Sequence, residues 1–369
     1  MAMRPLQTAA RQVDAGALAE KAPEVYVPEA SRETAPGLAS PERDASPEPP
    51  RCMVCHGFTA VSCSGLFDTR FGIEGEAEVR RCQQCGLEQI DPAPTPAELK
   101  DLYERYYNFG GERGTPYTVL REKFLSSFLY RLWIRLDGDI SFHRRQGGGR
   151  LLDIGCNEGR TLKNYAHNGF HAEGAELNEN AAAVARAAGF EVYTGPLDDF
   201  VPAAPYDVVV LSNVLEHALD PKAMLLSARR LLAEGGQLWI SCPNSRSWLR
   251  SVFGRSWINW HVPFHISHFS PQTLASLLEQ CGLVVAESRQ ITPALWVAHS
   301  VLSRCFARSG RPTRQMRNPA LVFALVALSR LLLFPLLNLG NRCGRGDCLI
   351  TVAKNSEAKA VRDRRRAGR

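Results

Sequence analysis

The nine residues Leu151-Leu152-Asp153-Ile154-Gly155-Cys156-Asn157-Glu158-Gly159 give the clearest indication of the fold. The first four form an apolar run that predicts a buried β-strand, and the glycines after them predict a tight turn into a helix. In open α/β sheets a turn of this kind lies at the carboxyl end of a central strand, where ligands bind. We therefore expect a ligand site over residues 155–159.

Short apolar runs alternate with helical patterns on the carboxyl side of this turn. We expect further strands at 172–177, 191–193, 207–211, 237–241, 283–286 and 348–353, and helices at 161–168, 180–188, 221–233 and 271–281. Such alternation is typical of a parallel sheet with helices on both faces. The predicted fold class is α/β, with a Rossmann-like, doubly wound sheet of seven strands.

The residues around the turn indicate what kind of ligand binds there. A dinucleotide site reads G-x-G-x-x-G, but Asn157 replaces the second glycine and Glu158 follows at the helix start, where a carboxylate repels phosphate. Glu176 ends the second strand, where an acid can accept hydrogen bonds from both ribose hydroxyls. Leu197 and Asp198 follow the third strand, in reach of an adenine amine. A lone acid is more often a solvated loop residue, but this set favours a phosphate-free, cationic nucleoside such as S-adenosylmethionine.

Residues 150–290 resemble the class I S-adenosylmethionine-dependent methyltransferases, in the branch of ubiquinone-biosynthesis O-methyltransferases and cell-envelope saccharide methyltransferases. The matching stretches are LLDIGCNEG at 151–159, Gly174-Ala175-Glu176, YDVVVLSNVLEHALDP at 206–221 and LLAEGGQLWISCPN at 231–244. The resemblance implies that the last strand of the sheet is antiparallel. It also implies donor contacts at Asp153, Gly155, Gly159, Glu176 and Asp198, and Cys156, Leu197 and Asn213 complete the expected donor site.

Two histidines are the candidate catalytic bases. Methyl transfer is an in-line displacement for which a protein aligns the reactants and takes the proton of a hydroxyl acceptor. His217 follows the fourth strand, and His265 lies in the histidine-rich residues 260–269, on the acceptor side of this fold. The alternative for each is a structural role beneath the loop. The resembling quinone enzymes can hold a divalent metal beside His217, but Asn213 replaces an acid there, which argues against a metal.

Two CxxC pairs, Cys52/Cys55 and Cys82/Cys85, are separated by 26 residues. Each pair presents two thiolates to one ion, so together they predict a structural zinc with four cysteine ligands and no open position. The segment Arg81-Cys82-Gln83-Gln84-Cys85-Gly86-Leu87, followed by Asp91-Pro92-Ala93-Pro94-Thr95, resembles zinc-ribbon leaders fused to methyltransferases of polysaccharide loci. Residues 51–91 hold four arginines and six acids, which argues against RNA as the ribbon's partner.

Charge and cysteine content bear on whether the protein binds nucleic acid and on the cellular compartment in which it works. The net charge of +6 comes largely from the chain's last third, so no broad basic surface supports a nucleic-acid partner or an RNA methyltransferase. Eleven cysteines, an odd number, suit a reducing compartment better than a disulfide framework. The first thirty residues lack the apolar core of a secretory signal. We expect a cytoplasmic protein, at the inner face of the membrane if any segment meets lipid.

Residues 292–346 form a long insertion before the last expected strand. Residues 320–339 are long and apolar enough to cross a membrane, but the flanking strands must join one sheet, and Arg330 would be costly in lipid. Two alternatives remain. The insertion contacts the membrane interface, with five upstream arginines (Arg304, Arg308, Arg311, Arg314 and Arg317) on anionic headgroups, or it forms a helical hairpin with residues 295–306 over the acceptor pocket or a second subunit.

These observations divide the chain into five parts and predict one activity. The parts are a disordered leader (1–50), a zinc ribbon (51–93), a helical linker (94–149), a methyltransferase domain with its insertion (150–355) and a basic tail (356–369). We expect transfer of a methyl group to a sugar hydroxyl or a lipid-linked saccharide. The alternatives are an isoprenoid quinone phenol and a non-catalytic binding module of the same fold. The oligomeric state is not indicated.

Overall fold

The computed structural model describes all residues except 1–49, 107–122, 125–126 and 357–369, and every structural statement below refers to the described residues. The expected leader and basic tail therefore lie almost entirely outside them. Part of the linker predicted over 94–149 also lies outside. Its described residues include helices α1 (Pro96–Tyr106) and α3 (Phe128–Asp137), the second of which Ser127 caps.

The core of the molecule is the seven-stranded sheet that the sequence predicts. Its strands are β4 (Arg150–Ile154), β5 (His171–Glu176), β6 (Val192–Thr194), β7 (Tyr206–Ser212), β8 (Leu232–Pro243), β10 (Leu283–Ile291) and β11 (Cys348–Asn355). They are ordered β10-β11-β8-β7-β4-β5-β6. Strands β8, β7, β4, β5 and β6 are parallel, whereas β11 is antiparallel to both of its neighbours. The Rossmann-like fold class and the antiparallel last strand are confirmed.

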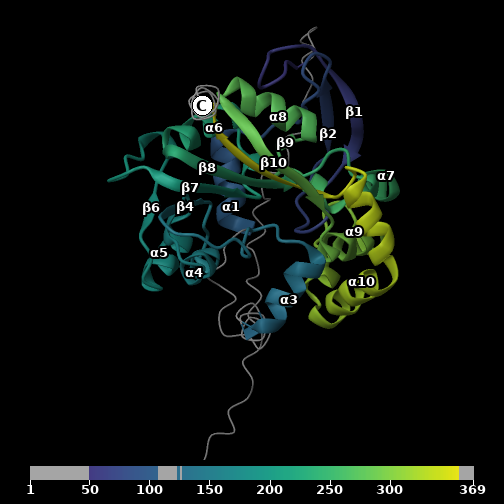
Figure 1. Ribbon diagram of the computed structural model, residues 1–369. Helices are drawn as coiled ribbons and strands as arrows, with labels where there is room; N and C mark the ends of the chain where they lie inside the picture. Colours follow the sequence, from purple (N-terminus) through teal and green to yellow (C-terminus); the bar gives the residue numbers. More distant parts are fainter. Residues whose placement is uncertain (1–49, 107–122, 125–126, 357–369) are drawn as a thin grey trace, which may run out of the picture. The chain divides into compact units, whose positions relative to one another are not determined.

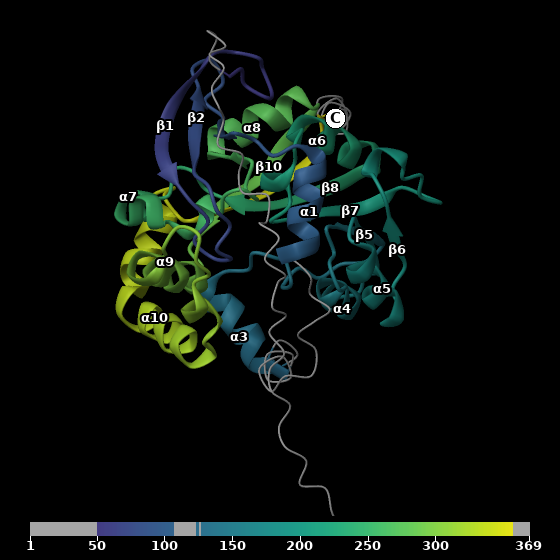
Figure 2. The same cartoon turned by 180° about the vertical axis from the view of Figure 1, so that it is seen from behind.

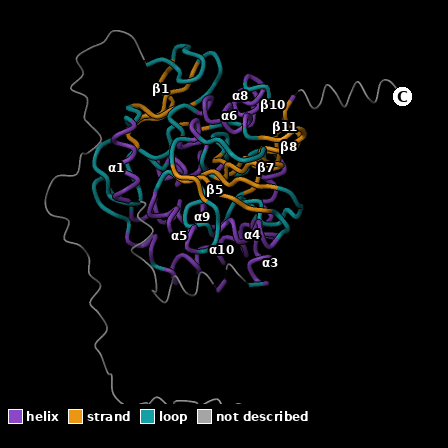
Figure 3. Tube along the Cα trace, turned by 90° about the vertical axis from the view of Figure 1, so that its left-hand side faces the viewer, coloured by secondary structure: helices purple, strands orange, loops and turns teal. Residues whose placement is uncertain are grey.

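Alternate side chains of the strands fill two hydrophobic clusters, one on each face of the sheet. Leu152 packs in one cluster with residues of α6 (Pro221–Arg230) and α8 (Pro271–Gln280). Its neighbour Leu151 packs in the other with residues of α4 (Arg160–His167), beside which α5 (Glu179–Ala187) lies. Figures 1 and 3 show α6 and α8 on one side of the strands and α4 and α5 on the other. Both faces of the sheet are therefore covered, as in other doubly wound folds.

The four-cysteine segment shares its sheet with the methyltransferase domain. Strands β1 (Thr59–Leu66), β2 (Ala77–Cys82) and β3 (Glu88–Asp91) form an antiparallel sheet whose fourth strand is β9 (Ser267–His268). Glu88 pairs with His268, and the amide of Ile90 donates to the carbonyl of Ile266 at 2.9 Å. The sheet of the ribbon thus includes a strand from the histidine-rich segment (260–269), and the sequence did not indicate this pairing.

The insertion between β10 and β11 is a helical hairpin. It consists of α9 (Ala294–Phe306), the short helix η6 (Arg314–Arg317) and α10 (Pro319–Arg342). Helix α9 buries one face against the domain, whereas α10 buries only Ser329 and Leu337 completely. Among the described helices, α10 alone is long and apolar enough to cross a membrane by length and composition, and 11% of its most apolar stretch is buried.

Candidate functional site

The acids predicted to hold the donor lie at one edge of the sheet. Strands β7, β4, β5 and β6 are parallel neighbours, so their carboxyl ends meet there. Asp153 belongs to β4, Glu176 ends β5, and Asn213 directly follows β7. Leu197 and Asp198 begin the short helix η2 (Leu197–Asp199) that follows β6. The fold therefore brings the predicted donor residues together, and their role in binding stays a prediction.

The glycine turn after β4 is held in place by Glu176. One carboxylate oxygen of Glu176 accepts the backbone N–H of Asn157 at 2.9 Å, and the other accepts that of Asn178 at 2.9 Å. Gly155 has a φ of +73°, and a Cβ at this position would lie 2.8 Å from Cγ2 of Val214. Because only glycine tolerates that approach, the turn packs directly against the loop after β7.

Asp153 lies under this turn in an environment that disfavours its charge. Its side chain is 2% exposed and accepts a hydrogen bond from the hydroxyl of Thr161. Burial raises the pKa of Asp153 to about 7, with a smaller contribution from the nearby charge of Glu176. A carboxyl group with this pKa ionises more readily when a cation binds beside it.

The other predicted donor residues at this edge of the sheet differ in their burial and contacts. The thiol of Cys156 is buried in the core against Gly174, so only its backbone can meet a donor. Gly159 has a φ of +74°, and a Cβ there would meet Ala185 of α5 at 2.8 Å. Leu197 packs against the core, and Asp198 accepts a hydrogen bond from Ser227. Asn213 has a φ of +54°, and its buried Oδ1 has no hydrogen-bond partner among the described residues.

The structure brings the two predicted bases into contact. His217 lies in the short helix η3 (Leu215–His217), and its ring centroid is 4.7 Å from that of His265. The Nδ1 atom of His217 lies 2.9 Å from the carbonyl oxygen of Phe264, and that of His265 lies 2.8 Å from the carbonyl oxygen of Asn259. A carbonyl can only accept, so each Nδ1 carries its proton and each Nε2 keeps a lone pair.

Burial keeps these histidines neutral. It lowers the pKa of His217 to about 4, and it lowers that of His265 well below the usual value, where the neighbouring His217 adds to the effect. The pKa of His261, whose ring lies 4.9 Å from that of His265, is lowered for the same reason. At neutral pH these imidazoles are therefore weak proton acceptors and good ligands.

Glu216 is the residue of this site that the sequence reasoning missed. It is 1% exposed, and neither carboxylate oxygen has a hydrogen-bond partner among the described residues. Burial raises its pKa to about 8. The ligand atoms of Glu216, His217 and His265 all lie within 4.8 Å of one another. Two imidazoles and a carboxylate without a partner suit a divalent transition metal, so these residues fit an ion despite Asn213.

Half-buried aromatic side chains surround the histidines. The ring of Phe71, from the ribbon, lies 6.0 Å from that of His261 and 5.6 Å from that of Phe264. The ring of Tyr103, from α1, lies 6.1 Å from that of His217. These rings come from parts of the chain far apart in sequence, so no local pattern could assign them to the site.

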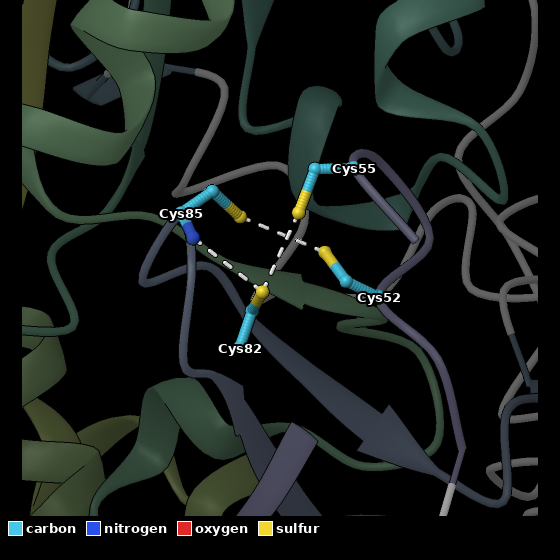
Figure 4. Close-up of side chains that lie close together, drawn as sticks. All are labelled: Cys52, Cys55, Cys82 and Cys85. Carbon is cyan, nitrogen blue, oxygen red and sulfur yellow. Dashed lines mark hydrogen bonds between the residues drawn. The ribbon is translucent and has the colours of Figure 1, made fainter. Parts of the chain in front are cut away.

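The four predicted zinc ligands converge on one point (Figure 4). The sulfur atoms of Cys52 and Cys85 are 3.6 Å apart, those of Cys55 and Cys82 are 3.4 Å apart, and all four lie within 4.8 Å of one another. These distances are too long for disulfides, whose S–S length is about 2.05 Å. Four thiolates around one zinc, at about 2.3 Å each, would be spaced similarly. The cluster therefore fits a tetrahedral zinc.

Comparison with known proteins agrees with this geometry. A family model described as a methyltransferase domain matches residues 121–288. The ubiquinone biosynthesis O-methyltransferase of Aromatoleum aromaticum is 31% identical over 168 residues, which cover 42% of this chain and 71% of that protein. The protein of the same name from a Ruegeria species is 30% identical over 175 residues, which cover 43% of this chain and 71% of that protein. The protein of the same name from Cronobacter sakazakii is 30% identical over 128 residues, which cover 31% of this chain and 52% of that protein.

Solved structures resemble the chain more distantly. An S-adenosylmethionine-dependent methyltransferase from Mesorhizobium loti is 18% identical, with a TM-score of 0.38, over 59% of this chain and 99% of that protein. At this level the likeness carries no conclusion about function.

Proposed function

This chain belongs to the class I S-adenosylmethionine-dependent methyltransferases, and we propose that it transfers the donor's methyl group to a phenolic hydroxyl of an isoprenoid-quinone type of acceptor. The proposal departs from the saccharide favoured by the sequence alone. The relatives named above are ubiquinone biosynthesis enzymes, which supports the phenol.

The observation that carries the proposal is the contact between the glycine turn and the loop after β7. Gly155 lies against Val214, and the residues that follow Val214 in that loop are Leu215, Glu216 and His217. A donor bound over the turn would therefore lie next to the histidines. The aromatic side chains of Phe71 and Tyr103 would contact the ring of an acceptor held between them.

The acidity of the acceptor supports a phenol over a sugar. A phenol has a pKa of about 10, whereas an aliphatic hydroxyl is nearer to water at about 15.7. His217, whose pKa is lowered to about 4, is too weak a base to ionise an aliphatic hydroxyl efficiently. In the transfer the phenol oxygen attacks the donor methyl, the carbon–sulfur bond breaks, and the proton passes to Nε2 of a histidine.

A metal ion would take the place of the histidine base, because it would occupy the Nε2 atoms that otherwise accept the proton. Glu216, His217 and His265 would hold it. When bound, such an ion supplies a Lewis acid that lowers the pKa of a nearby hydroxyl. The four cysteines would hold a structural zinc, and the ribbon would position β9 and the histidine-rich segment.

A saccharide hydroxyl remains the second candidate, favoured by one observation. The matching family model ends before the insertion and begins after the ribbon, so the two segments that distinguish this chain lie outside it. The ribbon is also the part that resembles leaders of polysaccharide-locus enzymes.

Calorimetry with S-adenosylmethionine tests the donor site. Glu176→Ala removes the acceptor for the ribose hydroxyls and for two backbone amides, so we expect donor affinity to fall roughly 5- to 150-fold, equivalent to about 1–3 kcal/mol. Glu191→Ala, an exposed acid beside β6, is the matched control and should bind like the wild type. Unchanged affinity in Glu176→Ala would contradict the proposed donor site.

S-adenosylmethionine with an isotopically labelled methyl group then distinguishes the phenol acceptor from the saccharide acceptor. The protein is incubated with a short-chain isoprenoid phenol in one reaction and with an envelope-saccharide extract in another. Label in an alkali-stable methyl ether of the phenol supports the proposal, and His217→Ala with His265→Ala should lower turnover while donor affinity stays within about twofold. Label in the saccharide alone would overturn the choice of acceptor and leave the donor site intact.

A further inference from the structure

Helix α10 exposes a wide apolar surface. Phe323, Leu331 and Leu332 are 73%, 79% and 68% exposed, and Leu328, Leu336 and Leu339 are each about half exposed. In a helix these positions span more than half of the circumference. Monomeric soluble proteins rarely expose so many large apolar side chains together, so this surface calls for a partner.

The charges of the insertion all have one sign. Residues 292–346 contain eight arginines and no aspartate or glutamate. Within α10 only Arg330 and Arg342 are charged. Arg330 turns inward, and its Nε donates to Asp137 of α3 at 2.6 Å. The exposed surface of α10 is therefore uncharged between its ends, and other arginines of the insertion lie just before the helix (Arg314, Arg317) and at or after its end (Arg342, Arg345).

Helix α3 extends this surface. Figures 1 and 2 show α3 and α10 side by side at the lower edge of the molecule, and the Arg330–Asp137 ion pair connects them. Phe128 and Leu129 of α3 are 77% and 63% exposed, and Leu132 and Leu136 are about half exposed. Two helices from distant parts of the sequence thus contribute to one apolar surface.

A basic hollow lies beside this surface. It measures about 400 Å³ and is lined by Arg131, Arg135 and Arg144 together with the apolar side chains of Phe128 and Leu132. Arginine forks bind phosphate oxygens in two places at once. The combination of three arginines with apolar lining residues suits a phosphate group attached to an acyl chain.

We propose that α3 and α10 form a membrane-docking surface that lies in the interface of an anionic bilayer. The exposed apolar side chains would enter the acyl region, and the arginines at the helix ends and in the hollow would contact lipid phosphates. Helix α10 does not cross the bilayer, because Ile291 of β10 and Cys348 of β11 pair in the same sheet and hold both ends of the insertion together.

The charges argue for lipid over a second copy of the chain. A two-fold interface places each surface against its own duplicate. Here that arrangement would bring the arginine-rich ends of two insertions together, and the insertion itself contains no acid to oppose them. Anionic headgroups supply the opposite charge, so the lipid surface is the complementary partner.

Co-sedimentation of the full chain with vesicles tests the proposal. We expect strong binding to vesicles that contain phosphatidylglycerol, weaker binding to phosphatidylcholine alone, and partial release by added salt. The triple variant Phe323→Glu, Leu331→Glu, Leu332→Glu should bind at least about tenfold more weakly. The matched control is Val61→Glu, Val201→Glu, Val252→Glu, which makes the same charge change at exposed apolar positions elsewhere and should bind as the wild type does, apart from a small electrostatic loss.

Two results would overturn it. One is equal vesicle binding by the α10 variant and its control while both keep the wild-type circular dichroism spectrum. The other is a lipid-free wild type that is dimeric by light scattering while the α10 variant is monomeric, which would assign the surface to a second copy. Methyl transfer is not measured in this experiment, so its outcome is separate from that of the proposed activity.

Discussion

At the scale of single residues, the two acids of the donor edge differ in what surrounds them. Glu176 accepts two backbone N–H groups, which hold its carboxylate and order the turn. Asp153 is buried with the hydroxyl of Thr161 as its hydrogen-bond donor, and its pKa is raised to about 7. Near neutral pH its charge is thus determined by whether a cation lies beside it.

The raised pKa of Asp153 predicts that donor binding depends on pH. A cationic donor favours the ionised carboxylate, so binding releases the proton that Asp153 holds below its pKa of about 7. Affinity for S-adenosylmethionine should therefore rise with pH, by up to about tenfold per unit below neutrality, and level off above it. Calorimetry in buffers of different ionisation enthalpy measures both the affinity and the proton released.

The control for this prediction is Asp153→Asn, which keeps the shape of the side chain and cannot ionise. Its donor affinity should be lower at neutral pH and nearly independent of pH. A wild-type affinity that is flat across the same range would show that Asp153 does not contact the cationic part of the donor.

Local patterns could place the predicted donor residues at one edge of the sheet but could not assemble the whole of the proposed acceptor side. Asp153 and Glu176 end strands of an alternating pattern, so their edge of the sheet follows from the sequence. Glu216 has no such signal, because its importance comes from a buried position beside His265, which is 49 positions further along the chain. Only tertiary structure shows that the carboxylate has no hydrogen-bond partner in the described part of the chain and that both rings have fixed tautomers.

At the scale of elements, the ribbon contacts the histidine-rich segment that we propose for the acceptor side. Its strand β3 pairs with β9, and Arg250, which precedes the histidine-rich segment, forms a buried ion pair with Glu88 at 2.5 Å. Cys82 ends β2, so the cysteine cluster holds the end of the sheet that β9 joins. A metal at the cysteines would therefore stabilise the histidine-rich segment through β3.

This arrangement predicts that loss of the ribbon's metal impairs the acceptor side more than the donor side. Cys52→Ser with Cys55→Ser should remove one zinc per chain, measured by mass spectrometry of the metal. We expect kcat/KM for the acceptor to fall at least about tenfold, while calorimetric affinity for S-adenosylmethionine changes less than about threefold.

Cys305→Ser is the matched control, since Cys305 is exposed and lies outside the cluster. It should keep the zinc and the activity of the wild type. An equal loss of donor affinity and acceptor turnover in the double variant would show general unfolding, and full activity without zinc would contradict the supporting role of the ribbon.

The elements were predictable where their own residues determine them. Strands β4, β7 and β11 are largely apolar runs, and α9 and α10 follow from apolar stretches with breaks between them. The pairing of the ribbon's strand β3 with β9 was not predictable, because the paired residues are more than 170 positions apart in the sequence. A two-residue strand such as Ser267–His268 has no pattern of its own and forms only because β3 offers it an edge.

At the scale of the whole molecule, one buried ion pair joins the linker, the insertion and the sheet. Asp137 of α3 accepts from Arg330 of α10 and from the backbone N–H of Ala294 at the start of α9, at 2.8 Å. Arg330 also donates to the carbonyl of Thr292, which follows β10, at 3.1 Å. The side chains of Arg330 and Asp137 are only 10% and 8% exposed, so water screens their attraction little.

Arg330→Met should therefore destabilise the protein by about 3–5 kcal/mol at neutral pH, because it leaves the carboxylate of Asp137 buried without its cation. Burial already raises the pKa of Asp137 above its usual value despite Arg330, and removal of the arginine raises it further. Because the pKa of Asp137 is higher in the folded protein than in the unfolded chain, protonation of Asp137 favours folding. This contribution to stability is complete below the pKa of the unfolded chain and is lost as pH rises through the pKa of the folded state. The loss in Arg330→Met should thus be smallest near pH 4, where Asp137 is protonated, and largest near pH 7, as measured by urea unfolding.

The second substitution Asp137→Asn distinguishes this cause from simple loss of packing. The double variant Arg330→Met, Asp137→Asn lacks the buried charge, so it should recover part of the stability and lose most of the pH dependence. Arg342→Met, at the exposed end of the same helix, should change stability by less than about 0.5 kcal/mol. If the single and double variants were equally unstable at every pH, Arg330 would act through packing of its stem, and the apolar surface of α3 and α10 would not depend on the ion pair between them.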